Sequence, residues 1–156
     1  MPATKSHRVY EYKLQRTRST LIASEAVADF ETLANELIVA RLARAVVGNM
    51  PREHLLSFYV DRANRVIGYE VVSFGSDGNV SCAPAELLRS ALLSGASGVI
   101  LVHNHPSGLA QPSADDDALT REVAKALKLI GLQLLDHVIV TENTHYSYAS
   151  DRKVGS

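Results

Sequence analysis

The most restrictive feature of the sequence is a short, almost continuous apolar run, VILVHNH, at residues 99–105. Its length suits a β-strand better than a helix, and it lacks the apolar–polar alternation of a strand with one face in water. A strand that is apolar on both faces belongs in the interior of a sheet. The chain is therefore expected to fold around a sheet with this run as a central strand.

Helical and strand-like patterns alternate along the rest of the chain. Apolar residues recur at helical spacing over residues 24–46, with Ser24 as the N-cap, and a turn at 61–65 separates the two strands of a predicted hairpin. The other predicted elements are a strand at 8–14, hairpin strands at 54–60 and 66–74, helices at 84–93 and 114–130, and strands at 132–140 and 145–149. This mixture indicates an α/β fold layered around one sheet.

Length and composition are those of an ordinary single-domain protein. The 156 residues are 46% hydrophobic, enough for a core, and the formal net charge of −1 gives no reason to expect a polyanionic partner. Cys82 is the only cysteine, so no internal disulfide is possible. The sequence shows neither a signal peptide nor a bilayer-spanning run, which predicts a cytoplasmic protein without membrane contact.

The first twenty residues depart from this charge balance, because only Glu11 is acidic there. The basic residues of the stretch are Lys5, Arg8, Lys13, Arg16 and Arg18. A solvated basic arm is the expected role, and contact with nucleic acid is the alternative.

Two histidines end the central strand and precede a helix with an acidic first turn. His103 and His105 are two residues apart, so in extended chain both imidazoles point to the same side. Asp116 is expected in the first turn of the following helix. Two imidazoles and one carboxylate, with a fourth position left to water, are the ligand set that a catalytic zinc site uses. Ser113 and Asp116 also fit a capping box, which needs no metal, so the serine has two candidate roles.

A hydrolytic zinc site also needs a general base, and two glutamates are candidates. Glu53 precedes the first hairpin strand and Glu70 lies in the second, and the spacing alone does not choose between them. Farther along the chain, Asp136 and His137 are expected to form a buried, hydrogen-bonded pair, with a supporting role for His137 at the metal site as the alternative.

These residues resemble a known family. The pattern of His103, His105, Ser113 and Asp116 matches the JAMM metal motif of MPN-fold proteins, and LVHNHPSG with LLDHVIV downstream resembles the bacterial RadC family over roughly residues 50–150. The resemblance implies a three-layer α/β/α sandwich with a mixed sheet, of the cytidine-deaminase-like type.

The resemblance also implies a chemistry. One zinc ion per chain would be bound by His103, His105 and Asp116, with Glu53 as the catalytic base and Ser113 as the group that stabilises the oxyanion. The implied reaction is hydrolysis of a peptide, isopeptide or other amide bond, with a peptide or protein as the partner substrate. Residues 1–48 are then expected to form an N-terminal strand and helix segment, and residues 49–152 the metallohydrolase domain.

Two departures from the family pattern stand out. RadC proteins usually carry Pro-Arg-Glu where residues 84–86 read Pro-Ala-Glu, so a surface contact made by that arginine is in doubt. The first fifty residues also lack the glycine hairpins of the family's helix-hairpin-helix region. The chain is therefore expected to be a short RadC-like protein, with no support in its sequence for a role in DNA repair.

Four alternatives to the zinc hydrolase are weighed. The letters HNH suggest a nuclease, but Asn104 has the opposite strand parity from both histidines and is expected to point away from them. A zinc deaminase would need cysteine ligands that one cysteine does not supply. A non-catalytic MPN-fold binding module and a DNA-associated RadC-like protein are the alternatives that stay open.

Overall fold

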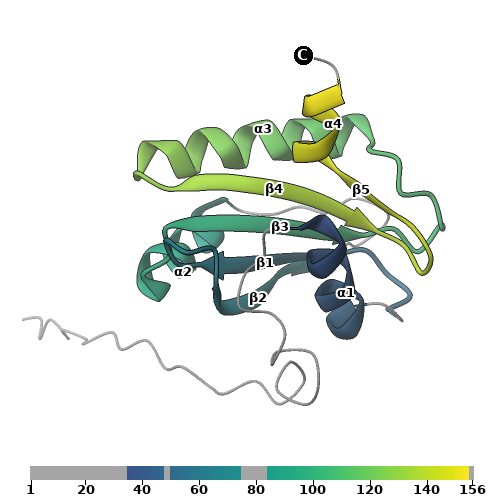
Figure 1. Ribbon diagram of the computed structural model, residues 1–156, viewed down its shortest axis with the longest axis horizontal. Coiled ribbons are helices and arrows are strands. Elements are labelled where there is room, and N and C mark those ends of the chain that lie inside the picture. Colours follow the sequence, from purple (N-terminus) through teal and green to yellow (C-terminus); the bar gives the residue numbers. More distant parts are fainter. Residues whose placement is uncertain (1–34, 48–49, 75–83, 155–156) are drawn as a thin grey trace, which may run out of the picture.

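The computed structural model describes residues 35–47, 50–74 and 84–154 (Figure 1). The predicted strand at 8–14, residues 24–34 of the predicted first helix, the basic arm and Cys82 lie outside the described residues. In chain order the elements are α1 (Glu36–Val47), β1 (His54–Val60), β2 (Val66–Phe74), α2 (Pro84–Ser94), β3 (Gly98–Asn104), α3 (Ala114–Leu129), β4 (Gln133–Val140), β5 (His145–Ser147) and α4 (Tyr148–Val154).

One five-stranded sheet has the order β2-β1-β3-β4-β5. Strands β3 and β4 are parallel, and the other neighbouring pairs are antiparallel, so the sheet is mixed. Every residue of β3 is buried, and β3 lies in the middle of the sheet. The prediction that the apolar run forms the central strand is confirmed, and the predicted hairpin is formed by β1 and β2.

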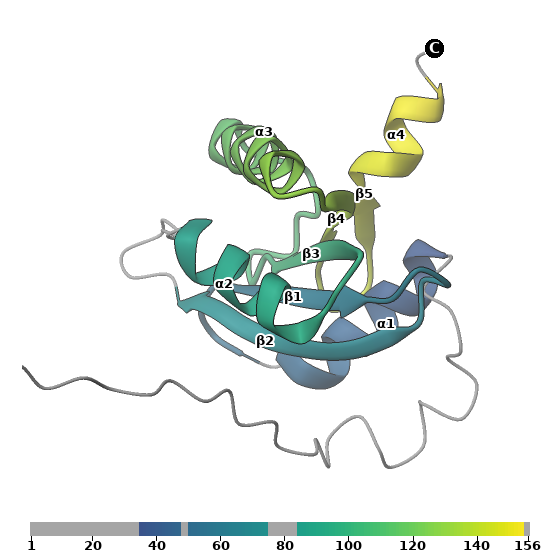
Figure 2. The ribbon, with the colours of Figure 1, turned by 90° about the vertical axis from the view of Figure 1, so that its left-hand side faces the viewer.

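Helices cover both faces of the sheet, which gives three layers (Figure 2). The buried face of α1 packs on one face against side chains such as Phe58, Ile100 and Val138. The other face packs against α2 and α3 through residues such as Leu101 and Leu127. The predicted three-layer α/β/α sandwich is therefore confirmed. None of the helices in the described part of the chain has the length and apolar character needed to cross a bilayer.

Two of the predicted boundaries need correction, the start of the first helix and the end of the last strand. The first helix does not run unbroken through residue 35, because the Asn35 side chain accepts a hydrogen bond from the Leu37 backbone N–H at 2.7 Å and α1 begins at Glu36. The last strand ends at Ser147 instead of Ala149. There the Asp136 carboxylate accepts a hydrogen bond from the Ala149 N–H at 2.9 Å, which stabilises the first turn of α4.

Gly98 lies at the start of β3, where its neighbours leave no room for a side chain. A Cβ atom there would lie 2.9 Å from Cδ1 of Leu135 and 3.2 Å from Cγ2 of Val60. We expect Gly98→Ala to lower the free energy of unfolding by about 1–3 kcal/mol, since a packed core resists an added methyl group. Gly68→Ala is the control, because its nearest contact would be an ordinary 3.9 Å from Tyr59. Urea unfolding of both variants checks this, and equal stabilities would contradict the packing argument.

Candidate metal centre

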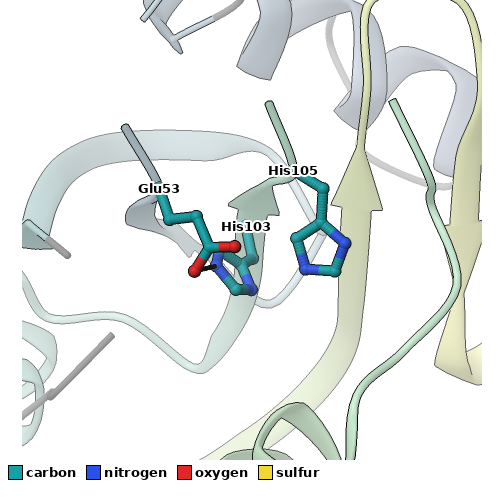
Figure 3. A group of neighbouring side chains, drawn as sticks. All are labelled: Glu53, His103 and His105. Atoms are coloured by element: carbon teal, nitrogen blue, oxygen red, sulfur yellow. Dashed lines mark ion pairs between the residues drawn. The ribbon is translucent and has the colours of Figure 1, made fainter. Parts of the chain in front are cut away.

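The predicted site residues come from three segments that meet at the carboxyl end of β3. His103 lies near the end of that strand and is opposite Leu55 of β1 in the antiparallel register. Glu53 precedes β1 by one residue and shares the strand parity of Leu55, so its side chain points to the same face. Figure 3 shows the carboxylate of Glu53 beside the imidazole of His103, with His105 next to them. Oε2 of Glu53 lies 3.5 Å from Nε2 of His103.

Each imidazole uses its Nδ1 atom to donate a hydrogen bond. His103 Nδ1 lies 2.8 Å from Oδ1 of Asp116, and His105 Nδ1 lies 2.8 Å from the carbonyl oxygen of Leu109. A carboxylate and a carbonyl oxygen only accept, so the proton is on Nδ1 in both rings. In the neutral rings, both Nε2 atoms then keep a lone pair available. Histidines that bind metals commonly hold their second nitrogen in this way.

Asp116 is buried in the first turn of α3 and contacts both histidines. Its Oδ2 lies 3.4 Å from Nε2 of His105, in addition to the hydrogen bond between Oδ1 and His103. Burial raises the pKa of Asp116, but the hydrogen bonds from His103 and Ser113 and the nearby ring of His105 outweigh it and hold this pKa well below the ordinary value. The Asp116 carboxylate in turn raises the pKa of His105, because it lies 3.4 Å from Nε2 and favours a proton there. Asp116 is therefore an ionised carboxylate placed between the two imidazoles.

Ser113 is the N-cap of α3, as the capping-box interpretation predicts. Its Oγ accepts from the Asp116 N–H at 3.1 Å and donates to Oδ2 of Asp116 at 2.8 Å, and its own N–H donates to that oxygen. The capping role is confirmed. The predicted oxyanion role stays a prediction, and it would require the hydroxyl to exchange its hydrogen bond to Asp116 for one to the substrate.

Ser113→Ala is expected to lower the free energy of unfolding by about 1 kcal/mol, because the helix loses its cap. Chemical denaturation in the presence of a chelator isolates this effect from metal binding. Ser107→Ala is a control in the same loop, since Ser107 is exposed and its Oγ makes only a 3.4 Å contact with the Leu109 N–H. Equal stability of Ser113→Ala and wild type would argue against a capping contribution.

The structure separates the two candidate bases. Glu53 reaches the histidines, and its side chain is 30% exposed, so solvent and substrate have access to it. Glu70 lies in β2, opposite Ser57 of β1, and its Oε2 accepts a hydrogen bond from the hydroxyl of Tyr59 at 2.9 Å. Burial and this contact raise the pKa of Tyr59, so the phenol stays protonated and keeps Glu70 engaged. The geometry favours Glu53.

Asn104 has a positioning role that sequence reasoning missed. Its side chain points away from the histidines, as predicted, and makes two hydrogen bonds to the backbone on either side of Glu53. Oδ1 accepts from the His54 N–H at 2.6 Å, and Nδ2 donates to the carbonyl oxygen of Arg52 at 3.0 Å. Asn104 thus holds the segment that carries Glu53 against the end of β3. The sequence shows no sign of this, because the contact joins residues fifty positions apart.

The donor set fits a metal ion. Glu53, His103 and His105 offer ligand atoms that all lie within 4.8 Å of one another. Nε2 of His103 is buried and has no hydrogen-bond partner among the described residues, as expected of an atom placed to meet a ligand. Asp116, the third predicted ligand, lies against both rings from the other side. These four side chains, of Glu53, His103, His105 and Asp116, form one cluster. The ligand set predicted from the sequence stays a prediction.

His137 lies behind this cluster in β4 and is fully buried. Its imidazole does not bind Asp136, because neighbouring strand residues point to opposite faces, and that carboxylate instead accepts from the His137 backbone N–H at 2.7 Å. The imidazole contacts Thr120, with 2.7 Å between Nδ1 and Oγ1. Burial, and then the proximity of His103, lower the pKa of His137 to about 3, so this ring is neutral at ordinary pH.

A groove of about 590 Å³ borders the cluster. Its walls are the segment before β1, the turn after β3 and the connection from β4 to β5, and residues lining it include Met50, His105, Pro106 and Glu142. The connection is held to α1 by Arg44, whose Nε and Nη2 donate to the carbonyl oxygens of Thr141 and Thr144. One wall of the groove is therefore tied to α1.

Comparison with known proteins agrees with this architecture. A sequence profile of the RadC-like JAB domain matches residues 33–154, most of the chain. The chain belongs to the RadC-like JAB domain family. It is similar to a UPF0758 protein of Coprothermobacter proteolyticus, with 39% identity over 115 residues that cover 74% of this chain and 49% of that protein. A UPF0758 protein of Streptococcus thermophilus is 36% identical over 132 residues, or 85% of this chain and 58% of that protein.

The chain thus spans about half the length of these curated relatives. The match to the JAB domain begins before α1, and α1 contributes Val39, Leu42 and Val47 to the same core as the sheet. The cluster at the end of β3 lies within the matched region. The chain is therefore a member of the JAB family and carries a group of side chains that could hold a metal ion, and both findings are consistent with a hydrolytic domain.

Proposed function

We propose that this RadC-like JAB domain is a zinc-dependent metallohydrolase of the JAMM type that cleaves a peptide, isopeptide or other amide bond. The observation that carries the proposal is the state of the two histidines. Both imidazoles donate Nδ1–H to fixed acceptors, which leaves Nε2 of each ring available as a ligand. The carboxylate of Glu53 lies near these atoms. His103, His105 and Asp116 are the proposed zinc ligands, and Glu53 is the proposed general base.

Zinc, when bound, would supply a Lewis acid that lowers the pKa of water and polarises the scissile carbonyl group. Glu53 would take a proton from the attacking water on a carboxylate oxygen and deliver it to the leaving nitrogen. Ser113 would donate a hydrogen bond to the oxygen that becomes negative during attack. Asn104 would keep Glu53 in place through its two backbone contacts.

The groove beside His105 supports a polymeric substrate, because it is open and bordered by both polar and apolar residues. A peptide or a protein segment would lie along it and present one carbonyl group to the cluster. Zinc rather than a harder ion is proposed because two imidazole nitrogens are the common ligands of this borderline metal.

The test is the metal content of the purified chain, followed by an activity assay. We expect about one zinc per chain by elemental analysis, as for a single mononuclear site. We also expect cleavage of quenched-fluorescent peptides, or of peptides joined through a lysine side chain, that stops when a chelator removes the metal. A chain that takes up no zinc after dialysis against it would contradict the proposal and favour a non-catalytic binding module.

A further inference from the structure

Thr120, on α3, and His137, on β4, meet directly behind the candidate metal centre. Oγ1 of Thr120 lies 2.6 Å from the carbonyl oxygen of Asp116 and 2.7 Å from Nδ1 of His137. All three residues are buried, so water does not compete for these hydrogen bonds. The contacts join β4 to the turn of α3 that carries Asp116.

The directions of the two hydrogen bonds follow from simple counting. The carbonyl oxygen of Asp116 can only accept, so it takes the single hydroxyl proton of Thr120. Oγ1 of Thr120 must then accept from His137, which places the imidazole proton on Nδ1. Nε2 of His137 is buried and has no hydrogen-bond partner among the described residues. Only one tautomer of His137 therefore suits this site.

Two aromatic rings lie nearly parallel to the ring of His137. Its ring lies 5.1 Å from that of Tyr148 with an interplanar angle of 5°, and 6.3 Å from that of His103 with an angle of 19°. Tyr148 also donates its hydroxyl proton to Oδ1 of Asp117 at 2.7 Å, which ties the first turn of α3 to α4. The imidazole is thus fixed in orientation as well as in tautomer.

From these contacts we infer that Thr120 and His137 are positioning residues for the metal centre. They fix the first turn of α3 on β4, and this holds Asp116 within 2.8 Å of His103. The inference rests on the proposed function, because it assigns the pair a role in metal binding. Supporting partners of this kind commonly change metal affinity without touching the metal.

Thr120→Val tests the inference, since it removes the hydroxyl and keeps the shape of the side chain. We expect zinc affinity to fall by about 10-fold or more, while Thr120→Ser, which restores a hydroxyl, stays within about 3-fold of wild type. Val123→Ala is the control for stability alone, because Val123 is buried on the same helix and packs in the core away from the cluster. It should destabilise the fold and leave zinc affinity within about 2-fold.

His137 offers a second pair of variants. In His137→Asn the side-chain amide places a donor close to the position of Nδ1, whereas His137→Leu has none. We expect the asparagine variant to retain more zinc affinity than the leucine variant.

Cobalt substitution adds a measurement that a loss of stability alone does not change. The visible absorption bands of the bound cobalt should shift in Thr120→Val, because the coordination changes, and should stay unchanged in Val123→Ala.

The outcomes separate this inference from the proposed function. If zinc affinity falls no more in Thr120→Val than in Val123→Ala, the positioning role is wrong even though the chain binds zinc. If the wild-type chain binds no zinc, the proposed function fails. Nitrogen NMR of the metal-free chain then decides whether Thr120 and His137 position α3. A protonated Nδ1 of His137, and weaker exchange protection of the Asp116 amide in Thr120→Val, would support the positioning of α3. A proton on Nε2 would overturn it.

Discussion

Glu53→Gln is expected to leave zinc bound and to reduce turnover by at least about 100-fold. Glutamine has the size of glutamate but cannot accept a proton from water, so only the proton transfer is lost. The proposed ligands are unchanged, and Asn104 still holds the backbone on both sides of residue 53. Elemental analysis measures the zinc, and cleavage of a peptide identified with the wild-type chain measures the turnover.

Glu70→Gln is the matched control for this variant. It makes the same chemical change at Glu70, the other glutamate that the sequence offers as a base, and it affects only the contact with Tyr59. Its turnover should equal that of wild type. Full activity of Glu53→Gln would exclude Glu53 as the base. Loss of activity in Glu70→Gln without loss of stability would favour Glu70 as the base.

The part of the site that is local in sequence could be predicted from the sequence. The spacing of His103 and His105 fixes their common direction, and Ser113 with Asp116 is a local capping pattern. The apolar run predicted a central strand for the same reason, because its pattern reports burial on both faces. The hairpin and the third helix also depend on short-range signals.

Contacts between distant segments could not be predicted in this way. Glu53 meets His103 because β1 and β3 pair in the register that sets Leu55 opposite His103, and no residue pattern encodes that register. The contact between Thr120 and His137 depends in the same way on how α3 docks on β4. Its basis lies in tertiary packing, which local periodicity does not report.

The error at the end of the last strand has a related cause. Residues 148 and 149 continue an alternating pattern that favours a strand, yet the Asp136 carboxylate and Ser147 supply acceptors for the first backbone N–H groups of α4. Burial raises the pKa of Asp136, although its three hydrogen bonds act in the opposite direction. A carboxylate thirteen positions away, together with the adjacent Ser147, overrode the local preference for a strand.

His105→Ala is expected to weaken zinc binding by more than about 100-fold, beyond the 10–100-fold loss that is usual for residues that only support a ligand. The physical reason is the loss of a coordinating nitrogen whose ring is already oriented by the Leu109 carbonyl group. Competition with a chromogenic chelator measures the affinity. His145→Ala is the control, because His145 lies in β5 and is not part of the group that could hold the ion.

Asp116→Asn decides which carboxylate completes the site. If Asp116 is a ligand, the Asp116→Asn variant should lose about as much zinc affinity as His105→Ala does. The structure also supports a different division of roles, because Asp116 accepts the Nδ1 proton of His103 while Glu53 lies within the donor group. If Asp116→Asn retained zinc and Glu53→Gln lost it, the two carboxylates would exchange roles. Glu53 would then be a ligand, and Asp116 the acceptor that orients His103.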